Sequence, residues 1–324
     1  RGAESLRLLA ERYGEDKIAH FMTAIKNEAA LKCREMLEKM PDGTSESIEY
    51  LDDGSVLKAK IIKKKERLKI DFSGTDAVHP GNLNATPAIV NSVIMYVLRL
   101  LIDEPLPLNE GLLDPVTIEL PTCMINPEFR EDPADCPAVV GGNTETSQRL
   151  VDLLLKPFKE IACSQGTMNN VLFGNEKFGY YETIGGGTGA GPGFHGADAV
   201  HHHMTNTAGT DPEILEHRYP VRLEKYAVRE DSGGKGKFRG GNGIERELTF
   251  LEPVSLSVLT QHRVEVPYGL EGGKPGAAGK QWIIKKDGSK IPLSSVSGGE
   301  LEAGDRFYIQ TPGGGGFGKK PNNK

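Results

Sequence analysis

Glycine is concentrated in six parts of this chain, and that clustering limits the folds open to it. The stretches are 141–142, 185–193, 233–243, 269–279, 298–299 and 313–318. Forty glycines and twenty prolines make up about 19% of the 324 residues, against an average of about 12%. Since glycine reaches positive φ without strain, the stretches fit tight loops over a β scaffold. They equally fit loops that line an active site shared with another segment.

One glycine stretch matches a nucleotide-binding pattern in letters only. Residues 191–196 read G-x-G-x-x-G, but a dinucleotide loop needs a strand before its first glycine and a helix after its last. Here a glycine loop precedes the pattern, and Pro192 lies inside it. The sequence G-x-x-x-x-G-K-[ST] does not occur, so the chain offers no P-loop lysine for ATP.

Charge and cysteine usage narrow the class of protein. The formal net charge of −6 argues against nucleic acid as a main partner, because no positive excess can displace counterions. No apolar run reaches the roughly 18 residues of a membrane span, so we expect no membrane partner. The four cysteines form no C-x-x-C pair and favour a reduced, cytoplasmic setting. The chain starts at Arg1 inside a predicted helix, so we expect it to be part of a longer polypeptide.

The apolar pattern predicts a helical and mixed N-terminal half. Helices are expected at 3–13, 16–40 and 87–102, and strands at 47–51, 56–62, 68–72 and 117–120. In the helix at 16–40, apolar residues recur at steps of three and four and form one stripe. The helix at 87–102 is apolar on nearly every side, which predicts a central, buried helix.

The sequence pattern changes after the helix expected from residue 144: from there on, short predicted strands alternate with glycine turns. Strands are expected at 171–173, 180–184, 221–228, 244–251, 255–261, 282–286, 290–293 and 306–311, with a short helix after Asp211. The predicted fold class is α+β, with a mainly antiparallel C-terminal half and long glycine-rich loops. We divide the chain into a mixed region, 1–140, and a β-rich region, 141–324.

Histidines cluster beside one glycine stretch. Five of the eight histidines are His195, His201, His202, His203 and His217. His195 and Asp198 form an H-x-x-D pair of a kind that suits zinc, iron or manganese, but two fixed letters also arise by chance. If the segment is extended, His201 and His203 share one face and can contact a substrate. The alternative is that these histidines only bond their neighbours, and we expect no complete metal site from them.

Several strings of residues follow one another over nearly the whole chain. They are 71–75 with 81–84, 141–149, 164–170, 180–192, 200–207, 211–220, 231–241 and 311–318. Together these strings resemble the hydantoinase B/oxoprolinase family. The resemblance implies the C-terminal portion of the B-type half of an ATP-dependent hydrolase that opens a cyclic amide, 5-oxoproline or a hydantoin.

The resemblance also implies partners and cofactors. An A-type ATPase half holds ATP with magnesium, and a region that precedes this segment in family members holds a divalent metal. The chain alone is therefore expected to be inactive, and we also expect it to form a homo-oligomer. Two alternatives stay open: a subunit of an ATP-dependent acetone or acetophenone carboxylase, and a scaffold that assembles with its partner without a catalytic group.

Seven positions that match the family strings are our candidate site residues. His201 and His203 are the candidate catalytic residues. The candidate substrate-binding residues are Asn143, Glu145, Gln148, Arg149 and Asn206. None of these residues is assigned to a metal.

Overall fold

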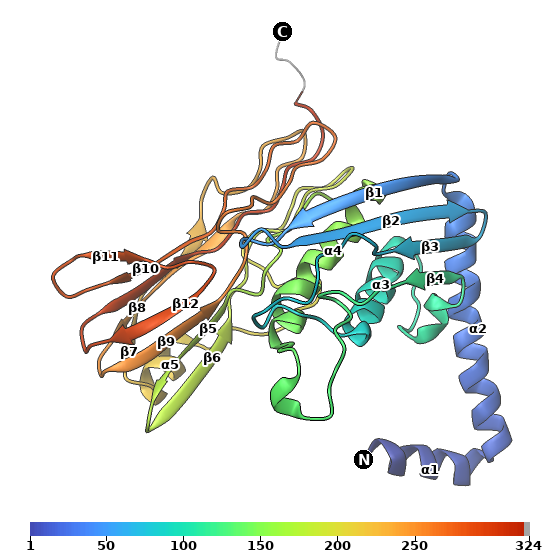
Figure 1. Cartoon of the computed structure of the whole chain (residues 1–324), viewed down its shortest axis with the longest axis horizontal. Coiled ribbons are helices and arrows are strands. Elements are labelled where there is room, and N and C mark those ends of the chain that lie inside the picture. Colours follow the sequence, from blue (N-terminus) through green and yellow to red (C-terminus); the bar gives the residue numbers. More distant parts are fainter. Residues whose placement is uncertain (321–324) are drawn as a thin grey trace.

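Residues 1–320, the part that the computed structural model describes, form an N-terminal part of helices over a mixed sheet and a C-terminal β-sandwich (Figure 1). The N-terminal helices are α1 (Gly2–Tyr13), α2 (Glu15–Lys39), α3 (Pro87–Leu101) and α4 (Ser147–Leu155). Single helical turns are η1 (Glu110–Leu113), η2 (Pro133–Asp135), the π-helical η3 (Gly142–Thr146) and η4 (Lys156–Phe158). The strands are β1 (Gly43–Tyr50), β2 (Val56–Lys64), β3 (Arg67–Asp71) and β4 (Val116–Glu119).

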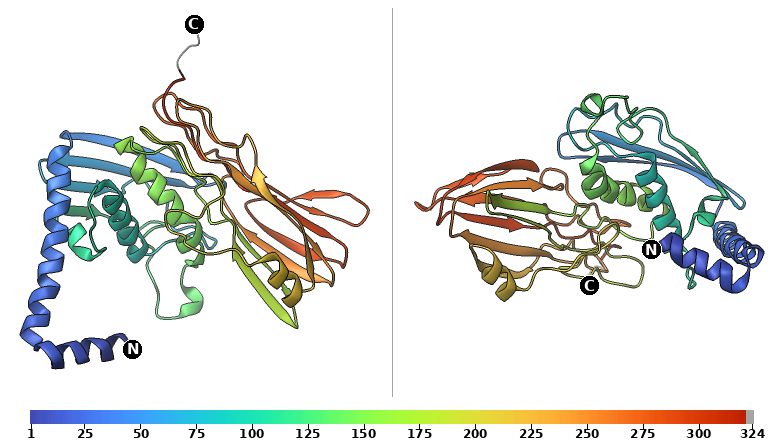
Figure 2. Two further views of the ribbon diagram at one scale, coloured as in Figure 1. Left: turned by 180° about the vertical axis from the view of Figure 1, so that it is seen from behind. Right: turned by 90° about the horizontal axis from the view of Figure 1, so that it is seen from below.

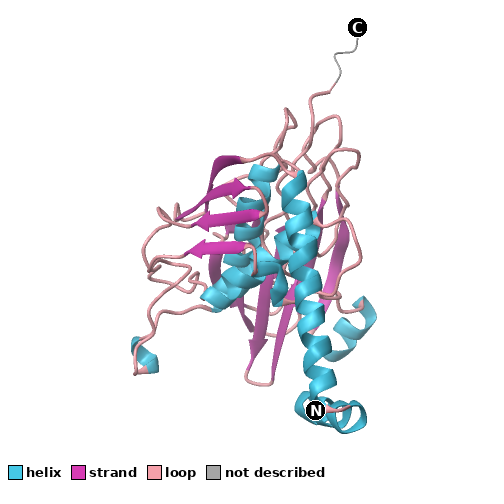
Figure 3. Ribbon diagram, turned by 90° about the vertical axis from the view of Figure 1, so that its right-hand side faces the viewer, coloured by secondary structure: helices cyan, strands magenta, loops and turns pink. Residues whose placement is uncertain are grey.

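The first sheet has the order β1-β2-β3-β4 and presents one apolar face to the helices. Strands β1 to β3 form an antiparallel meander, and β4 pairs with β3 in parallel. Along β2 the buried residues alternate with half-buried ones, as expected for a sheet covered on one face. Helices α2, α3 and α4 cover that face (Figures 1 and 3), and Leu37, Val93 and Leu154 join Leu57 and Ile61 in one core.

The C-terminal part packs two antiparallel sheets face to face. Its strands are β5 (Asn170–Asn175), β6 (Phe178–Thr183), β7 (Val221–Arg229), β8 (Gly243–Phe250), β9 (Val254–Leu259), β10 (Lys280–Ile284), β11 (Lys290–Pro292), β12 (Val296–Leu301) and β13 (Arg306–Gln310). The sheet orders are β11-β10-β13-β8-β7 and β12-β9-β5-β6. A second core, which includes Phe173, Phe250 and Phe307, fills the space between them. Helix α5 (Pro212–Arg218) begins at Asp211, whose carboxylate accepts from two backbone N–H groups.

The glycine stretches form a structure of their own between the two parts. Segments 185–191, 233–241, 269–277 and 312–318 run side by side and are joined by backbone hydrogen bonds; we call them the glycine bundle (Figures 1 and 2). Successive N–H groups of the last segment turn to different neighbours. The bonds run from Gly313 N to Ala277 O, Gly314 N to Gly241 O, Gly315 N to Cys163 O, Gly316 N to Lys274 O and Phe317 N to Phe238 O. Donor directions that repeat every third residue are those of a polyproline II helix.

Glycine is required in the bundle because the segments lie too close for side chains. A Cβ atom built on Gly187 would lie 1.9 Å from the Gly241 carbonyl oxygen, and one on Gly314 would lie 1.9 Å from the Thr188 carbonyl oxygen. The explanation by positive φ was therefore wrong for most of these glycines. Within the six stretches, only Gly193, Gly272 and Gly318 have positive φ.

The α+β expectation is confirmed, and every predicted helix and strand is present with small shifts of its ends. Strand β12 was missed because Gly298 and Gly299 lie inside it; glycine in a strand interior resembles a loop signal. Among residues 1–320, no helix is both long and apolar enough to cross a membrane. Helix α4 joins the N-terminal core although the boundary at residue 140 assigns it to the second region, and the division into domains stays a prediction.

Two helices are less buried than the sequence suggested. Helix α3 buries one stripe, which includes Val90, Val93 and Val97, whereas Leu100 is exposed, so the expectation of burial on all sides was wrong. Helix α2 buries only the C-terminal half of its stripe. Its N-terminal half extends beyond the sheet together with α1 (Figure 1), and it exposes Phe21 and Met22.

Candidate functional site

Helix α4 and the π-turn before it present a polar face inside the molecule. Glu145, Gln148, Arg149 and Asp152 follow one another at steps of three, one and three, a spacing that places them on one helical face. All four are buried. The opposite face supplies leucines and a valine to the N-terminal core. Burying four polar side chains is costly unless partners meet them, so this face is a candidate site.

Arg149 is the centre of the charges on this face. Its guanidinium contacts the carbonyl oxygen of Tyr50 and Nε2 of His262, and it lies 3.9 Å from a Glu49 carboxylate oxygen. Glu49 also pairs with Lys156 at 2.6 Å. Burial raises the pKa of Glu49, and the two neighbouring cations oppose that effect. Glu49 thus faces two cations, the buried Arg149 and the partly exposed Lys156.

Burial keeps the side chain of Glu145 in its neutral, protonated form. One of its oxygens accepts from the Asn170 side chain at 2.7 Å and from the Met168 backbone at 3.3 Å, and the other has no partner. Burial raises the pKa of Glu145 to about 8, although Thr167, Met168, Arg263 and Arg149 each lower it. At neutral pH the residue is therefore a carboxylic acid that can donate its proton in a hydrogen bond.

The histidine segment turns where an extended chain was expected. His203 has φ of 55°, in the left-handed region, and the Thr205 N–H donates to the His202 carbonyl oxygen. His201 and His203 therefore do not form one face of a strand, and the rings of His202 and His203 meet edge to face. His201 Nε2 lies 3.2 Å from the Thr207 hydroxyl. Burial lowers the pKa of both His201 and His202, so these imidazoles are neutral at pH 7.

His203 and Gln148 reach the polar face of α4. The Tyr96 hydroxyl lies 3.1 Å from His203 Nδ1, and His203 Nε2 lies 3.7 Å from an Asp152 carboxylate oxygen. Burial raises the pKa of Tyr96 to about 12, so its hydroxyl keeps its proton and can donate to Nδ1. In that arrangement Nε2 carries the imidazole proton. Gln148 donates to the His202 carbonyl oxygen at 3.3 Å, and its own Oε1 is buried without a partner.

The other sequence candidates lie elsewhere. Asn143 and Asn206 are exposed. His195 accepts from the Arg239 backbone N–H at 2.8 Å, and Asp198 pairs with the Arg239 guanidinium at 3.0 Å. Among residues 1–320, neither His195 nor Asp198 belongs to a group of three side chains that could hold a metal ion.

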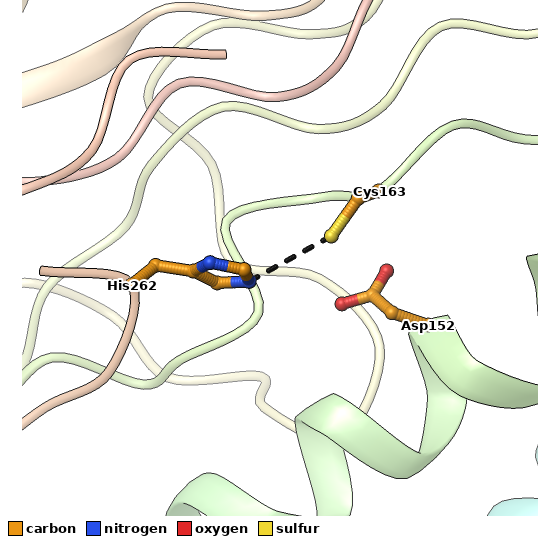
Figure 4. Close-up of side chains that lie close together, drawn as sticks. All are labelled: Asp152, Cys163 and His262. Carbon is orange, nitrogen blue, oxygen red and sulfur yellow. Dashed lines mark hydrogen bonds between the residues drawn. The ribbon is translucent and has the colours of Figure 1, made fainter. Parts of the chain in front are cut away.

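The structure also brings together three residues that the sequence analysis did not group. Asp152, Cys163 and His262 offer ligand atoms that all lie within 4.8 Å of one another (Figure 4). Burial, Asp152 and Glu49 raise the pKa of the Cys163 thiol, so the thiol is protonated. Their spacing along the chain carries no motif. Asp152 alone had a signal, because it continues the face of Glu145, Gln148 and Arg149 by one further turn.

Comparisons with known proteins agree with the family resemblance of the sequence and with the fold. The hydantoinase B/oxoprolinase family matches residues 1–320. The chain is 43% identical over 334 residues to 5-oxoprolinase 1 from Arabidopsis thaliana, covering 98% of this chain and 26% of that protein. It is 42% identical over 330 residues to 5-oxoprolinase from Dictyostelium discoideum, covering 99% of this chain and 26% of the relative.

Among solved structures, the fold resembles that of ATP-dependent caprolactamase from Pseudomonas jessenii. The TM-score is 0.82 at 24% identity, with 99% of this chain and 60% of the caprolactamase chain covered. This chain spans about a quarter of the length of the two oxoprolinases. The match over residues 1–320 and the identities above 40% place it in a family: the chain belongs to the hydantoinase B/oxoprolinase family.

Proposed function

We propose that the chain works as part of an ATP-dependent hydrolase of cyclic amides, of the 5-oxoprolinase type. The observation that carries this proposal is the 43% identity to a 5-oxoprolinase over 98% of the chain. In this proposal an A-type ATPase half binds ATP with magnesium and phosphorylates the amide oxygen. Water then adds to the ring carbon, the ring C–N bond breaks, and ADP, inorganic phosphate and the open-chain amino acid are released. The chain described here does not hydrolyse the substrate by itself.

The buried polar face of α4 offers groups that complement a cyclic amide. Such a ring presents an N–H donor beside a carbonyl acceptor. Gln148 Oε1 is a buried acceptor without a hydrogen-bond partner, and His203 Nε2 is buried without a hydrogen-bond partner, 3.7 Å from an Asp152 oxygen. In our proposal Gln148 accepts from the ring N–H and His203 donates to the ring oxygen.

Charge on the phosphorylated oxygen and on the tetrahedral intermediate would be stabilised by donors fixed in advance. In this proposal Arg149, which follows Gln148 on the buried face of α4, supplies a permanent cation, and neutral Glu145 supplies an acidic proton one turn away. The divalent metal that the family resemblance implies is assigned, in this proposal, to the part of the longer relatives that this chain does not span. It would supply Lewis-acid chemistry, and no residue of this chain is assigned to it.

The test is ring opening of 5-oxoproline by the chain reconstituted with its A-type half. We expect hydrolysis that needs ATP and both halves. His203→Ala and Gln148→Ala should each lower kcat, His203→Ala by roughly 100-fold, because a donor to the developing charge is worth about 3 kcal/mol. His217→Ala is the matched control, since His217 is exposed at the end of α5.

Other outcomes identify the rival functions. Consumption of a ketone that depends on ATP and bicarbonate, without ring opening, would indicate a carboxylase subunit. Full ring-opening activity in the His203→Ala, Gln148→Ala and Arg149→Met proteins would indicate that the chain acts as a scaffold. The homo-oligomeric state stays a prediction, which the mass of the reconstituted particle would test.

A further inference from the structure

We propose that Asp152, Cys163 and His262 form a buried zinc site at the point where α4 meets the loop after β9 (Figure 4). Carboxylate, thiolate and imidazole are the three ligand types that zinc binds in proteins. The three side chains converge from separate parts of the chain, and all three residues are almost completely buried. This inference is independent of the proposed hydrolase activity.

The imidazole of His262 is held in the form that binds a metal. Its Nδ1 lies 2.8 Å from the Glu265 carbonyl oxygen and donates its proton there. Nε2 is then left with its lone pair, which accepts from the Arg149 guanidinium and lies 3.7 Å from Cys163 Sγ. Zinc-binding histidines have this arrangement, in which the second ring nitrogen is fixed by a backbone carbonyl or a carboxylate.

The distances between donor atoms match zinc. Cys163 Sγ lies 3.7 Å from His262 Nε2. A tetrahedral zinc about 2.3 Å from sulfur and about 2.0 Å from nitrogen would hold those two atoms about 3.6 Å apart. Asp152 completes the set, since one of its oxygens accepts from the Ser164 N–H at 3.1 Å and the other, Oδ2, has no partner. A buried carboxylate oxygen without a partner is costly, and a cation would remove that cost.

Glycine is required at position 166, next to these ligands. A Cβ atom built there would lie 2.5 Å from His262 Nε2 and 3.1 Å from Asp152 Oδ2. Because glycine has no such atom, no side chain of residue 166 intrudes on the imidazole and the carboxylate, and Nε2 is contacted by the Arg149 guanidinium. Zinc binding releases the Cys163 thiol proton to solvent and leaves a thiolate ligand. It also displaces the Arg149 contact from Nε2, and the guanidinium then turns to Glu49, 3.9 Å away.

The test uses the chain stripped of metal with a chelator under reducing conditions and then given zinc or cobalt alone. We expect one zinc per chain by elemental analysis and a thiolate-to-cobalt charge-transfer band with cobalt. Cys163→Ser should abolish that band and weaken zinc binding by about 100-fold or more. His262→Gln should also weaken zinc binding, whereas Cys123→Ser, a buried thiol elsewhere, should leave binding and band unchanged.

Measurements on the wild-type protein alone can overturn the proposal, whether or not the variants fold. Wild-type protein that takes up zinc far below one per chain, or cobalt without the charge-transfer band, overturns the proposal. Stoichiometric zinc that survives in Cys163→Ser overturns it as well. In either case the cluster would be a hydrogen-bonded contact of Arg149, His262 and Cys163.

Discussion

Glu145 shows how burial alone can change the chemistry of one residue. Its pKa is raised to about 8 from the ordinary value of 4.5, because desolvation outweighs the nearby Arg263 and Arg149. Between those two pH values the unfolded chain releases a proton that the folded chain keeps. The free energy of unfolding therefore falls as the pH rises through this window, and the contribution that is present below pH 4.5 is lost near pH 8.

Glu145→Gln removes the titration and keeps an oxygen that can accept from Asn170 and Met168. Between pH about 5 and about 8, we expect the variant to lose less stability than the wild type, by a few kcal/mol, since one pKa unit corresponds to about 1.4 kcal/mol. Urea unfolding at the two pH values measures this difference. Glu160→Gln, at an exposed position, is the control and should follow the wild type. Parallel pH profiles of Glu145→Gln and wild type would contradict the prediction.

Sequence reasoning found only part of the candidate site. A family motif identifies residues along the chain, but it does not say where their side chains lie in space. The string at 141–149 led to Glu145, Gln148 and Arg149, which lie on one buried face. The same string led to Asn143, which is exposed. His262 could not be found this way, because it reaches Arg149 across a separation of 113 residues that leaves no local pattern.

At the scale of elements, the glycine bundle makes a strong prediction about added side chains. Gly187→Ala would put a methyl group 1.9 Å from the Gly241 oxygen and 2.5 Å from the Gly314 nitrogen, and backbone atoms cannot turn aside. We expect a loss of about 3 kcal/mol or more in the free energy of unfolding. Gly179→Ala on β6 is the control, because nothing lies within 4 Å of its Cβ position; it should change stability by less than about 1 kcal/mol. Equal effects of the two substitutions in urea unfolding would show that the bundle is not crowded.

Helix α2 offers a second element-scale test, because its apolar stripe is buried at only one end. Phe21 is 53% exposed and Leu37 is 0% exposed. Phe21→Ser should therefore cost less than about 0.5 kcal/mol, whereas Leu37→Ala should cost about 2–5 kcal/mol through lost burial and a cavity. Thermal unfolding of both variants compares them. A large loss from Phe21→Ser would mean that this end of the helix is packed against other residues.

Helices and strands were predictable because periodicity is a local property. Alternation along β2 and the three-and-four spacing along α2 each follow from the geometry of one element. The glycine bundle was not predictable, because its hydrogen bonds join segments such as 185–191 and 312–318 that lie far apart in the sequence. Polyproline II segments have no internal hydrogen bonds, so the sequence of one segment has no local pattern that predicts its pairing with the others.

At the scale of the whole molecule, Asp52 ties the two parts together. It lies in the turn between β1 and β2, and its carboxylate accepts from the backbone N–H groups of Arg263, Val264 and Glu265 at 2.7 to 3.1 Å. Ser295 adds a hydroxyl contact. These bonds join the turn of the first sheet to the loop that carries His262, next to the proposed zinc site.

Asp52→Ala should lower the free energy of unfolding by about 2–4 kcal/mol. One hydrogen bond to a charged group contributes about 1.5–3 kcal/mol, and the four bonds do not add in full because their part-buried or exposed donors bond to water once the carboxylate is removed. It should also separate the unfolding of the two cores. The single tryptophan, Trp282, reports the sandwich by fluorescence, and helical circular dichroism reports mainly the N-terminal part. We expect coincident urea transitions in the wild type and separate ones in Asp52→Ala.

The control is the neighbouring residue. Asp53 pairs with His79 at 2.7 Å and is partly exposed, so Asp53→Ala should cost at most about 1 kcal/mol and keep the transitions together. Coincident transitions in Asp52→Ala would show that the glycine bundle, and not this carboxylate, couples the cores.

The crowding in the glycine bundle also limits how this protein can change over generations. Every replacement of glycine adds at least one carbon atom, and at Gly187, Gly241 and Gly314 that atom would meet a carbonyl oxygen 1.9 Å away. Point mutation therefore offers no tolerated step at these positions, whatever the codon. A descendant that kept this fold but changed its function would still have to keep these glycines, so their presence in a lineage would reflect the lack of space around them and not a catalytic role.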